Sequence, residues 1–179
     1  MTSAAIKRPP FAGLFVGLAA VLSCACSPVQ SAEQFAPAAT AEQSADQPER
    51  HSEWGLPLIE VAVVRGERRI VFETEVADTP QAQARGMMFR TEMGDDEAML
   101  FPSERPAQRN FWMKNTPLPL DIIFIGVDGR ISNIERGVPY ELESVGSDGL
   151  ASAVLEIRGG LSDELGIVAG DRVEYDWPQ

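Results

Sequence analysis

The sequence predicts a β-rich α+β domain, built as a small and mostly antiparallel sheet or as a barrel-like closure of one, with one short helix. Short runs in which apolar and polar residues alternate recur from Ile59 onward, as expected of strands with one solvent-facing side. Turn signals such as Arg65-Gly66-Glu67 and Asp128-Gly129 separate these runs. The stretch from Trp54 to Gln179 has about 125 residues, which suffices for one hydrophobic core and not for two.

The elements follow in order along this stretch. Strands at 59–64 and 68–77 form a hairpin around Gly66. Asp78-Thr79-Pro80 then provides an N-cap and a first-turn proline for the helix QAQAR, which ends at a left-handed Gly86. Met87-Met88-Phe89 is expected to insert into the core. Further strands are expected at 98–101, 110–115, 119–126, 130–135, 153–158 and 172–177, with a short Ser162-capped turn at 162–166; the nearly continuous apolar character of 119–126 makes it a central strand.

Residues 1–26 predict a signal peptide. Lys7 and Arg8 precede an uncharged run, Phe11 to Ala25, that is too short to span a bilayer and has the length of a signal-peptide apolar region. Its end resembles a bacterial lipobox, in which the residue after the cleavage point is an acylated cysteine. Cys24 fits best and Cys26 is the alternative register. We expect a periplasm-facing protein held by lipid in the outer membrane, with a soluble periplasmic protein as the alternative.

Residues 27–53 predict a disordered tether, because Ala, Gln, Ser, Pro and Glu dominate and little apolar surface is available to offset ordering. His51, the only histidine, is expected to be a solvated residue of this tether. Residues 54–179 then form the single domain.

Composition excludes several classes of site. The net charge of −12 argues against binding nucleic acid through a basic surface. No histidine or cysteine follows Trp54, which removes Ser-His-Asp and Cys-His catalysis, His or Cys zinc sites, iron–sulfur clusters and disulfides from the domain. Cu(I) binding through thioethers is less favoured than core packing, because the methionines lack Met-x-Met spacing and a histidine. We therefore expect no metal and no cofactor. The methionines in question are Met87, Met88, Met93, Met99 and Met113.

The candidate ligand site centres on residues 110–121. In an extended strand Asn110, Trp112 and Lys114 project from one face. Lys114 is the only lysine after the leader, and beside Trp112 it could hold an anionic or carbohydrate-like ligand with the indole as a platform. The alternative is that Lys114 extends to solvent while Trp112 packs. Asn115 belongs to the same candidate set.

Asp121 interrupts the apolar run of 118–125, where a carboxylate is costly unless it is paired or hydrogen-bonded. A structural ion pair with Lys114 or an arginine is favoured over a cap on the Thr116-Pro117 turn or an acid with a raised pKa. Arg85 and Arg90 flank Gly86 and could face the same place, which would make the site cationic.

Three stretches carry a family resemblance: Arg85-Gly86-Met87-Met88-Phe89-Arg90, Met99-Leu100-Phe101, and Phe111-Trp112-Met113-Lys114-Asn115-Thr116 with Pro119-Leu120-Asp121. Together they resemble domain-of-unknown-function family 192, and Val154-Leu155-Glu156, Gly159-Gly160 and Gly170-Asp171-Arg172-Val173 fit its closing pattern. The resemblance implies a small, mostly β domain that is often exported. It implies no activity, cofactor or catalytic residue.

The sequence thus predicts a non-catalytic envelope module that binds a small ligand or a protein partner through Trp112, Lys114 and Asp121. The alternative is a hydrolase or lyase that uses Lys114 as base or Asp121 as acid, with Glu156 or Asp171 as a second carboxylate. The identity of the ligand or partner and the oligomeric state stay open.

Overall fold

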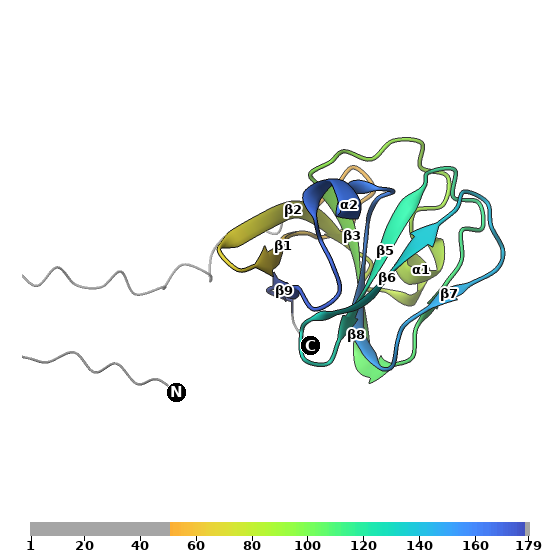
Figure 1. Ribbon diagram of the computed structural model, residues 1–179. Coiled ribbons are helices and arrows are strands. Elements are labelled where there is room, and N and C mark those ends of the chain that lie inside the picture. Colours follow the sequence, from red (N-terminus) through yellow and green to blue (C-terminus); the bar gives the residue numbers. More distant parts are fainter. Residues whose placement is uncertain (1–50, 178–179) are drawn as a thin grey trace, which may run out of the picture. The chain divides into compact units, whose positions relative to one another are not determined.

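The computed structural model describes residues 51–177 (Figure 1). The predicted signal peptide, the candidate lipid attachment at Cys24 or Cys26, and all of the predicted tether before His51 lie outside this range. Within it, no helix combines the length and apolar character needed to cross a membrane.

The domain is built on one seven-stranded sheet, which agrees with the predicted β-rich α+β class. The strand order is β6-β5-β8-β3-β2-β1-β9, and β2 and β3 pair in parallel while the other neighbours are antiparallel. In Figure 1, β1, β2 and β9 lie on the left, and β5 and β6 lie to their right. A separate two-stranded sheet joins β4 to β7. The strands are β1 (Leu58–Arg65), β2 (Arg68–Val76), β3 (Glu97–Ala107), β4 (Asn110–Phe111), β5 (Leu120–Gly126), β6 (Ile131–Gly137), β7 (Val145–Gly146), β8 (Ala151–Arg158) and β9 (Arg172–Tyr175).

The large sheet is not closed into a barrel. Of the two architectures that the sequence predicts, the structure therefore has the open sheet. At one end of its edge strands β6 and β9, Arg130 and Arg172 form an isolated bridge, and the Val173 amide donates to the Gly129 carbonyl at 2.8 Å. The Ile131 amide donates to the Asp171 carbonyl at 2.9 Å beside this bridge. Each edge therefore has little exposed length at that end.

The described residues 51–177 contain two helices where the sequence predicted one in the domain. The predicted helix is α1 (Pro80–Arg85), capped by the Thr79 hydroxyl, which accepts from the Ala82 amide at 3.1 Å, and followed by Gly86 at a φ of 48°. The second is α2 (Leu161–Leu165), at the place of the expected turn. Its N-cap is Gly160 rather than Ser162. The amides of Gly160 and Ser162 donate to the carboxylate of Asp121 on β5.

The central strand β5 is buried along its whole length, as its apolar run predicted, and its alternate residues enter two separate cores. Ile123 and Ile125 belong to one core and Ile122 and Phe124 to the other. Burial of each such side chain stabilises the fold by about 1.5–3 kcal/mol. The second core also holds the thioethers of Met87, Met99 and Met113, which confirms packing as their role.

Two local predictions were wrong. Of the segment 87–89, only Met87 is buried, while Phe89 is 65% exposed at a φ of 65°. The strand predicted at 110–115 ends at Phe111, because Asn115 adopts a φ of 56° and the Thr116 amide donates to the Met113 carbonyl in a turn. Lys114 therefore belongs to this turn and Trp112 to the irregular segment just before it, so neither lies on a strand face.

Candidate ligand-binding site

A pocket of about 320 Å³ lies between α1, β4 and the sheet. We call it the Glu156 pocket, after the carboxyl group in its wall. Both helix and loop residues contribute, so its walls come from segments far apart in the sequence. The lining residues are 83–88, 101, 109–113, 116, 120 and 156.

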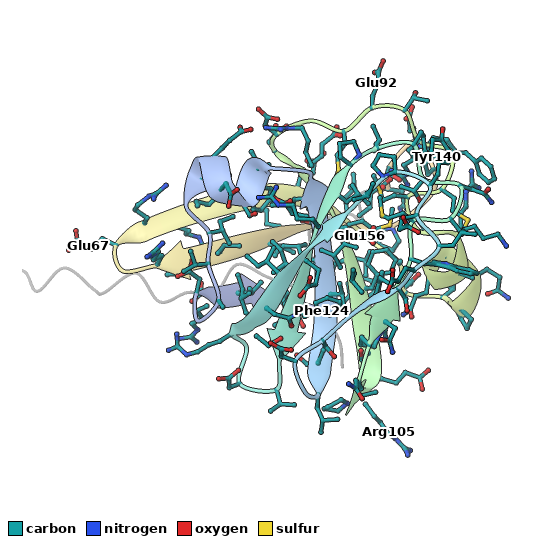
Figure 2. The ribbon with its side chains drawn as sticks, turned by 45° about the vertical axis from the view of Figure 1, so that its right-hand side comes forward. Glu67, Glu92, Arg105, Phe124, Tyr140 and Glu156 are labelled. Atoms are coloured by element: carbon teal, nitrogen blue, oxygen red, sulfur yellow. The ribbon has the colours of Figure 1, made fainter. Side chains whose placement is uncertain are left out.

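Glu156 is the unusual residue of the pocket. It lies on β8 between Met99 of β3 and Ile122 of β5 in the register, so it projects into the second core. The residue is 5% exposed, and its Oε2 has no hydrogen-bond partner. Figure 2 shows it among packed side chains of the domain. Burial raises the pKa of this carboxyl to about 8, although the charge of Arg90 opposes the shift.

This shift determines what the group offers at neutral pH. With a pKa near 8, the carboxyl group is mostly protonated at pH 7, so that it can both donate and accept a hydrogen bond. A buried polar atom without a partner costs about 1–3 kcal/mol, and native proteins contain few of them. The pocket wall therefore carries a hydrogen-bonding group that the described protein leaves unsatisfied.

Aromatic and aliphatic side chains form most of the remaining wall. The rings of Phe101 and Phe111 meet edge to face with centroids 5.0 Å apart, and Phe111 makes a similar contact with Phe124 at 6.1 Å. Leu120 and Met113 complete the apolar surface. Such a wall suits the flat or apolar body of an organic molecule.

Arg109 places a positive charge in the lining. Its Nη1 donates to the Ser103 hydroxyl at 2.9 Å, its Nη2 donates to Gln83 at 3.3 Å, and its guanidinium lies 5.6 Å from the centre of the Phe111 ring. Both hydrogen-bond partners are neutral. Burial lowers the pKa of Arg109, which nonetheless stays charged because arginine titrates far above neutrality.

Trp112 and Lys114, which the sequence singled out, do lie together. Trp112 is half exposed and lines the pocket, and the Lys114 ammonium sits 5.0 Å from the centre of its ring. Lys114 itself is exposed and lies outside the lining. A cation–π contact at such an exposed place contributes about 0.5–1 kcal/mol.

Arg85 and Arg90 share a partner but face different cavities. Their guanidinium groups lie 5.0 and 4.9 Å from the centre of the Trp54 ring. Arg85 lines the Glu156 pocket, whereas Arg90 forms a nearly buried ion pair with Glu75 and lines a second, more acidic cavity of about 590 Å³. Residues 51–54, 58, 73, 75, 87, 89–93, 97 and 98 line that cavity.

Backbone strain concentrates in the loops beside Trp112. The three non-glycine residues with positive φ in the described range are Phe89, Asn115 and Tyr140. Two backbone hydrogen bonds link their loops: the Phe89 amide donates to the Asn115 carbonyl at 2.8 Å, and the Tyr140 amide donates to the Thr116 carbonyl at 3.1 Å. Asn115 thus contributes to the site through its main-chain carbonyl, which accepts the hydrogen bond from Phe89. Strained residues of this kind gather at ligand sites, where they hold loops in one arrangement.

Asp121 is not part of this site. It is fully buried on the opposite face of the sheet, where its Oδ1 accepts from the Gly160 amide at 2.9 Å and its Oδ2 accepts from the amide and hydroxyl of Ser162 at 2.8 and 2.5 Å. Arg136 pairs with it at 3.3 Å. The predicted ion pair with an arginine is confirmed, and Lys114 is not its partner. Asp121 also caps α2 rather than the Thr116-Pro117 turn.

The sequence-based site thus missed its most informative member. The sequence indicates Glu156 only as a possible second carboxylate, and Arg109 and Phe111 are not among the candidate site residues that it predicts. A signal was available, since Glu156 interrupts the apolar run Ala153 to Ile157 in the way that singled out Asp121. Within residues 51–177, no group of three His, Cys, Asp or Glu side chains could hold a metal ion.

Comparison with known proteins gives a family and no activity. The model of the DUF192 family, described as "Uncharacterized ACR, COG1430", matches residues 61–175. A crystal structure of a protein of unknown function from Novosphingobium aromaticivorans is 47% identical, with a TM-score of 0.68, and the match covers 73% of this chain and 94% of that one. A putative transcription regulator from Sinorhizobium meliloti is 34% identical, with a TM-score of 0.65 and coverage of 67% and 95%. No curated protein matches the chain significantly.

Proposed function

The chain belongs to the DUF192 family, as the match over residues 61–175 shows, and we propose a function for it from its own site. Its domain is a non-catalytic binding module that holds a small organic ligand in the Glu156 pocket. The unpaired Oε2 of Glu156 carries the proposal. A ligand that offers Oε2 a hydrogen-bond partner gains about 1–3 kcal/mol over a ligand that buries this oxygen without one.

The pocket has the dimensions and composition of a ligand site. Its volume of about 320 Å³ lies at the lower end of the usual range, about 300–1,000 Å³, and apolar walls with a few polar groups are typical. The buried position of Glu156 favours a small ligand over a protein partner, since a protein surface would not reach a carboxyl group that is only 5% exposed.

Binding without catalysis fits the set of ionisable groups. Those in the lining are Arg85, Arg109 and Glu156, so a second carboxylate that could form an acid–base pair with Glu156 is not among them. Asp121 caps α2 on the other face of the sheet. No observation therefore favours the hydrolase or lyase in which Lys114 and Asp121 act together.

A fragment screen by NMR tests the binding function. We expect amide shift changes that cluster at Phe111, Trp112 and Met113, and we expect the same fragments to bind Glu156→Met at least tenfold more weakly, since the variant keeps an apolar wall and lacks the polar group. The matched control Glu60→Met alters an exposed glutamate of β1. If no fragment shifts these amides, or if Glu156→Met binds the same fragments equally well, the proposal fails.

We further propose that the module is exported and lipid-anchored, with its domain facing the periplasm. The support comes from the leader, whose apolar run ends in the lipobox-like sequence before Cys24. Full-length protein made in a Gram-negative host and labelled with an alkyne palmitate analogue should incorporate label and enter the outer-membrane fraction. Cys24→Ser should abolish labelling, whereas Cys26→Ser should not. Label lost only in Cys26→Ser would move the anchor to Cys26, and an unlabelled wild type would leave a soluble periplasmic protein.

A further inference from the structure

We infer that the ligand of the Glu156 pocket is an aromatic organic anion that bears a hydroxyl group: its carboxylate pairs with Arg109, its ring lies against Phe111, and its hydroxyl hydrogen bonds Glu156. This inference rests on the proposed binding function and adds the chemical class of the ligand.

The charges around the pocket select an anion. Two of the three ionisable lining residues, Arg85 and Arg109, are cations, and the ammonium of a third cation, Lys114, lies 5.0 Å from the ring of the lining residue Trp112. Arg109 is the cation placed to bind, because its two hydrogen-bond partners are neutral and its planar group can still pair with a carboxylate. No carboxylate of residues 51–177 pairs with Arg109, so a ligand anion would meet a guanidinium without an acidic partner in the described domain.

The protonated carboxyl group of Glu156 selects a neutral polar group at the other end. A hydroxyl can pair with Oε2 without ionising the acid, whereas an ammonium would require a buried carboxylate and would have to approach past the cations. A zwitterion of amino-acid type is therefore the less favourable ligand.

The apolar wall of the pocket selects an aromatic body. The edge-to-face pair of Phe101 and Phe111 and the indole of Trp112 line the same pocket as Arg109 and Glu156. Aromatic groups packed in this way gain about 0.5–1.5 kcal/mol beyond the burial of their area.

Titration followed by NMR, with 4-hydroxybenzoate and its longer homologue 4-hydroxycinnamate as probes, tests the class. We expect at least one of the two acids to shift the amides of Phe111 and Trp112. Its methyl ester, which lacks the anion, and its analogue without the hydroxyl should each bind at least tenfold more weakly. The zwitterion 4-(aminomethyl)benzoate should also bind at least tenfold more weakly than the better acid.

Two variants connect the preference to the residues. Arg109→Gln should reduce affinity for the acid at least tenfold and leave the ester unaffected, whereas Arg105→Gln, which alters an exposed arginine at the end of β3 (Figure 2), should change neither. Glu156→Met should weaken the hydroxyl-bearing acid more than its analogue without the hydroxyl, whereas Glu156→Gln, which keeps a neutral donor and acceptor, should preserve the difference.

The outcomes separate the two proposals. If neutral esters or the zwitterion bind the pocket as well as the acids do, the inferred class is wrong and the binding function stands. If neither acid shifts the pocket amides while other fragments do, the class is again wrong. If the fragment screen also fails, both proposals fall.

Discussion

Asp121 and Glu156 lie on adjacent strands, one register position apart, and face opposite sides of the sheet. Asp121 of β5 pairs with Ile157 of β8, the residue that follows Glu156 in the sequence. Glu156 in turn pairs with Ile122, the residue that follows Asp121. The two groups meet different surroundings. Asp121 receives hydrogen bonds from the start of α2 and an arginine, whereas one oxygen of Glu156 has no partner. The first group holds the fold together, and the second is available to a ligand.

Asp121→Asn should destabilise the domain by about 3 kcal/mol, because an uncompensated donor then faces the amide of Ser162 and the ion pair with Arg136 is lost. Urea unfolding followed by circular dichroism measures the change. Asp148→Asn, at an exposed position, is the control and should shift the free energy of unfolding by less than about 0.5 kcal/mol. A stable Asp121→Asn protein would show that the cap on α2 contributes little.

Glu156 should make the domain less stable as pH rises from 5 to 8. The pKa of its carboxyl is about 8 in the folded protein, against an ordinary value of 4.5, so the folded state holds a proton that the unfolded state has released. Stability from this group is complete below pH 4.5 and is lost as pH rises through 8, at up to about 1.4 kcal/mol per pH unit.

Glu156→Gln should remove this part of the pH dependence. Unfolding free energies of wild type and variant, measured in urea at pH 5, 6, 7 and 8, should diverge steadily, with the wild type relatively weaker at each higher pH. Glu60→Gln should keep the wild-type slope. Parallel curves for wild type and Glu156→Gln would mean that the buried carboxyl group is ionised at neutral pH.

Tyr140→Gly should be more stable than Tyr140→Ala by about 1 kcal/mol. Both substitutions remove the same largely exposed ring, but only glycine adopts the observed φ of 64° without strain. Thermal unfolding of the two variants gives the comparison directly. Equal stability would show that the loop relaxes to a negative φ once the ring is gone.

The sequence predicts well the features that local chemistry determines. The hairpin around Gly66 follows from alternation and a turn residue, and α1 follows from Thr79, Pro80 and Gly86. The burial of β5 follows from its apolar run. These signals act within a few residues of the chain, so they do not depend on which strands become neighbours.

The candidate site was harder to predict because it depends on register and on positive φ angles. The alternation from Asn110 to Asn115 resembles a strand, and only the left-handed Asn115 shows where that strand ends. Asp121 and Lys114 are close in sequence yet do not pair, since Asp121 enters the face that α2 covers. Burial, which the sequence does not give, distinguishes Glu156 from an ordinary glutamate of a half-exposed strand.

Gly137→Ala should destabilise the domain by about 2 kcal/mol, mainly through a steric clash with the buried side chain of Met113. A β-carbon at this position would lie 2.6 Å from the sulfur of Met113, which lines the Glu156 pocket. The added methyl therefore displaces Met113 toward the pocket, and the same variant should weaken the binding of any fragment found there. Unfolding in urea and a repeat of the fragment titration measure the two effects.

Met113→Val provides the matched background. With the shorter side chain, the methyl at residue 137 meets no sulfur, so Gly137→Ala should cost at least about 1 kcal/mol less in Met113→Val than in the wild type, a coupling typical of residues in contact. Additive effects in this cycle would show that Met113 does not transmit the change, and that the pocket wall at this point is set by the backbone of the strained turn.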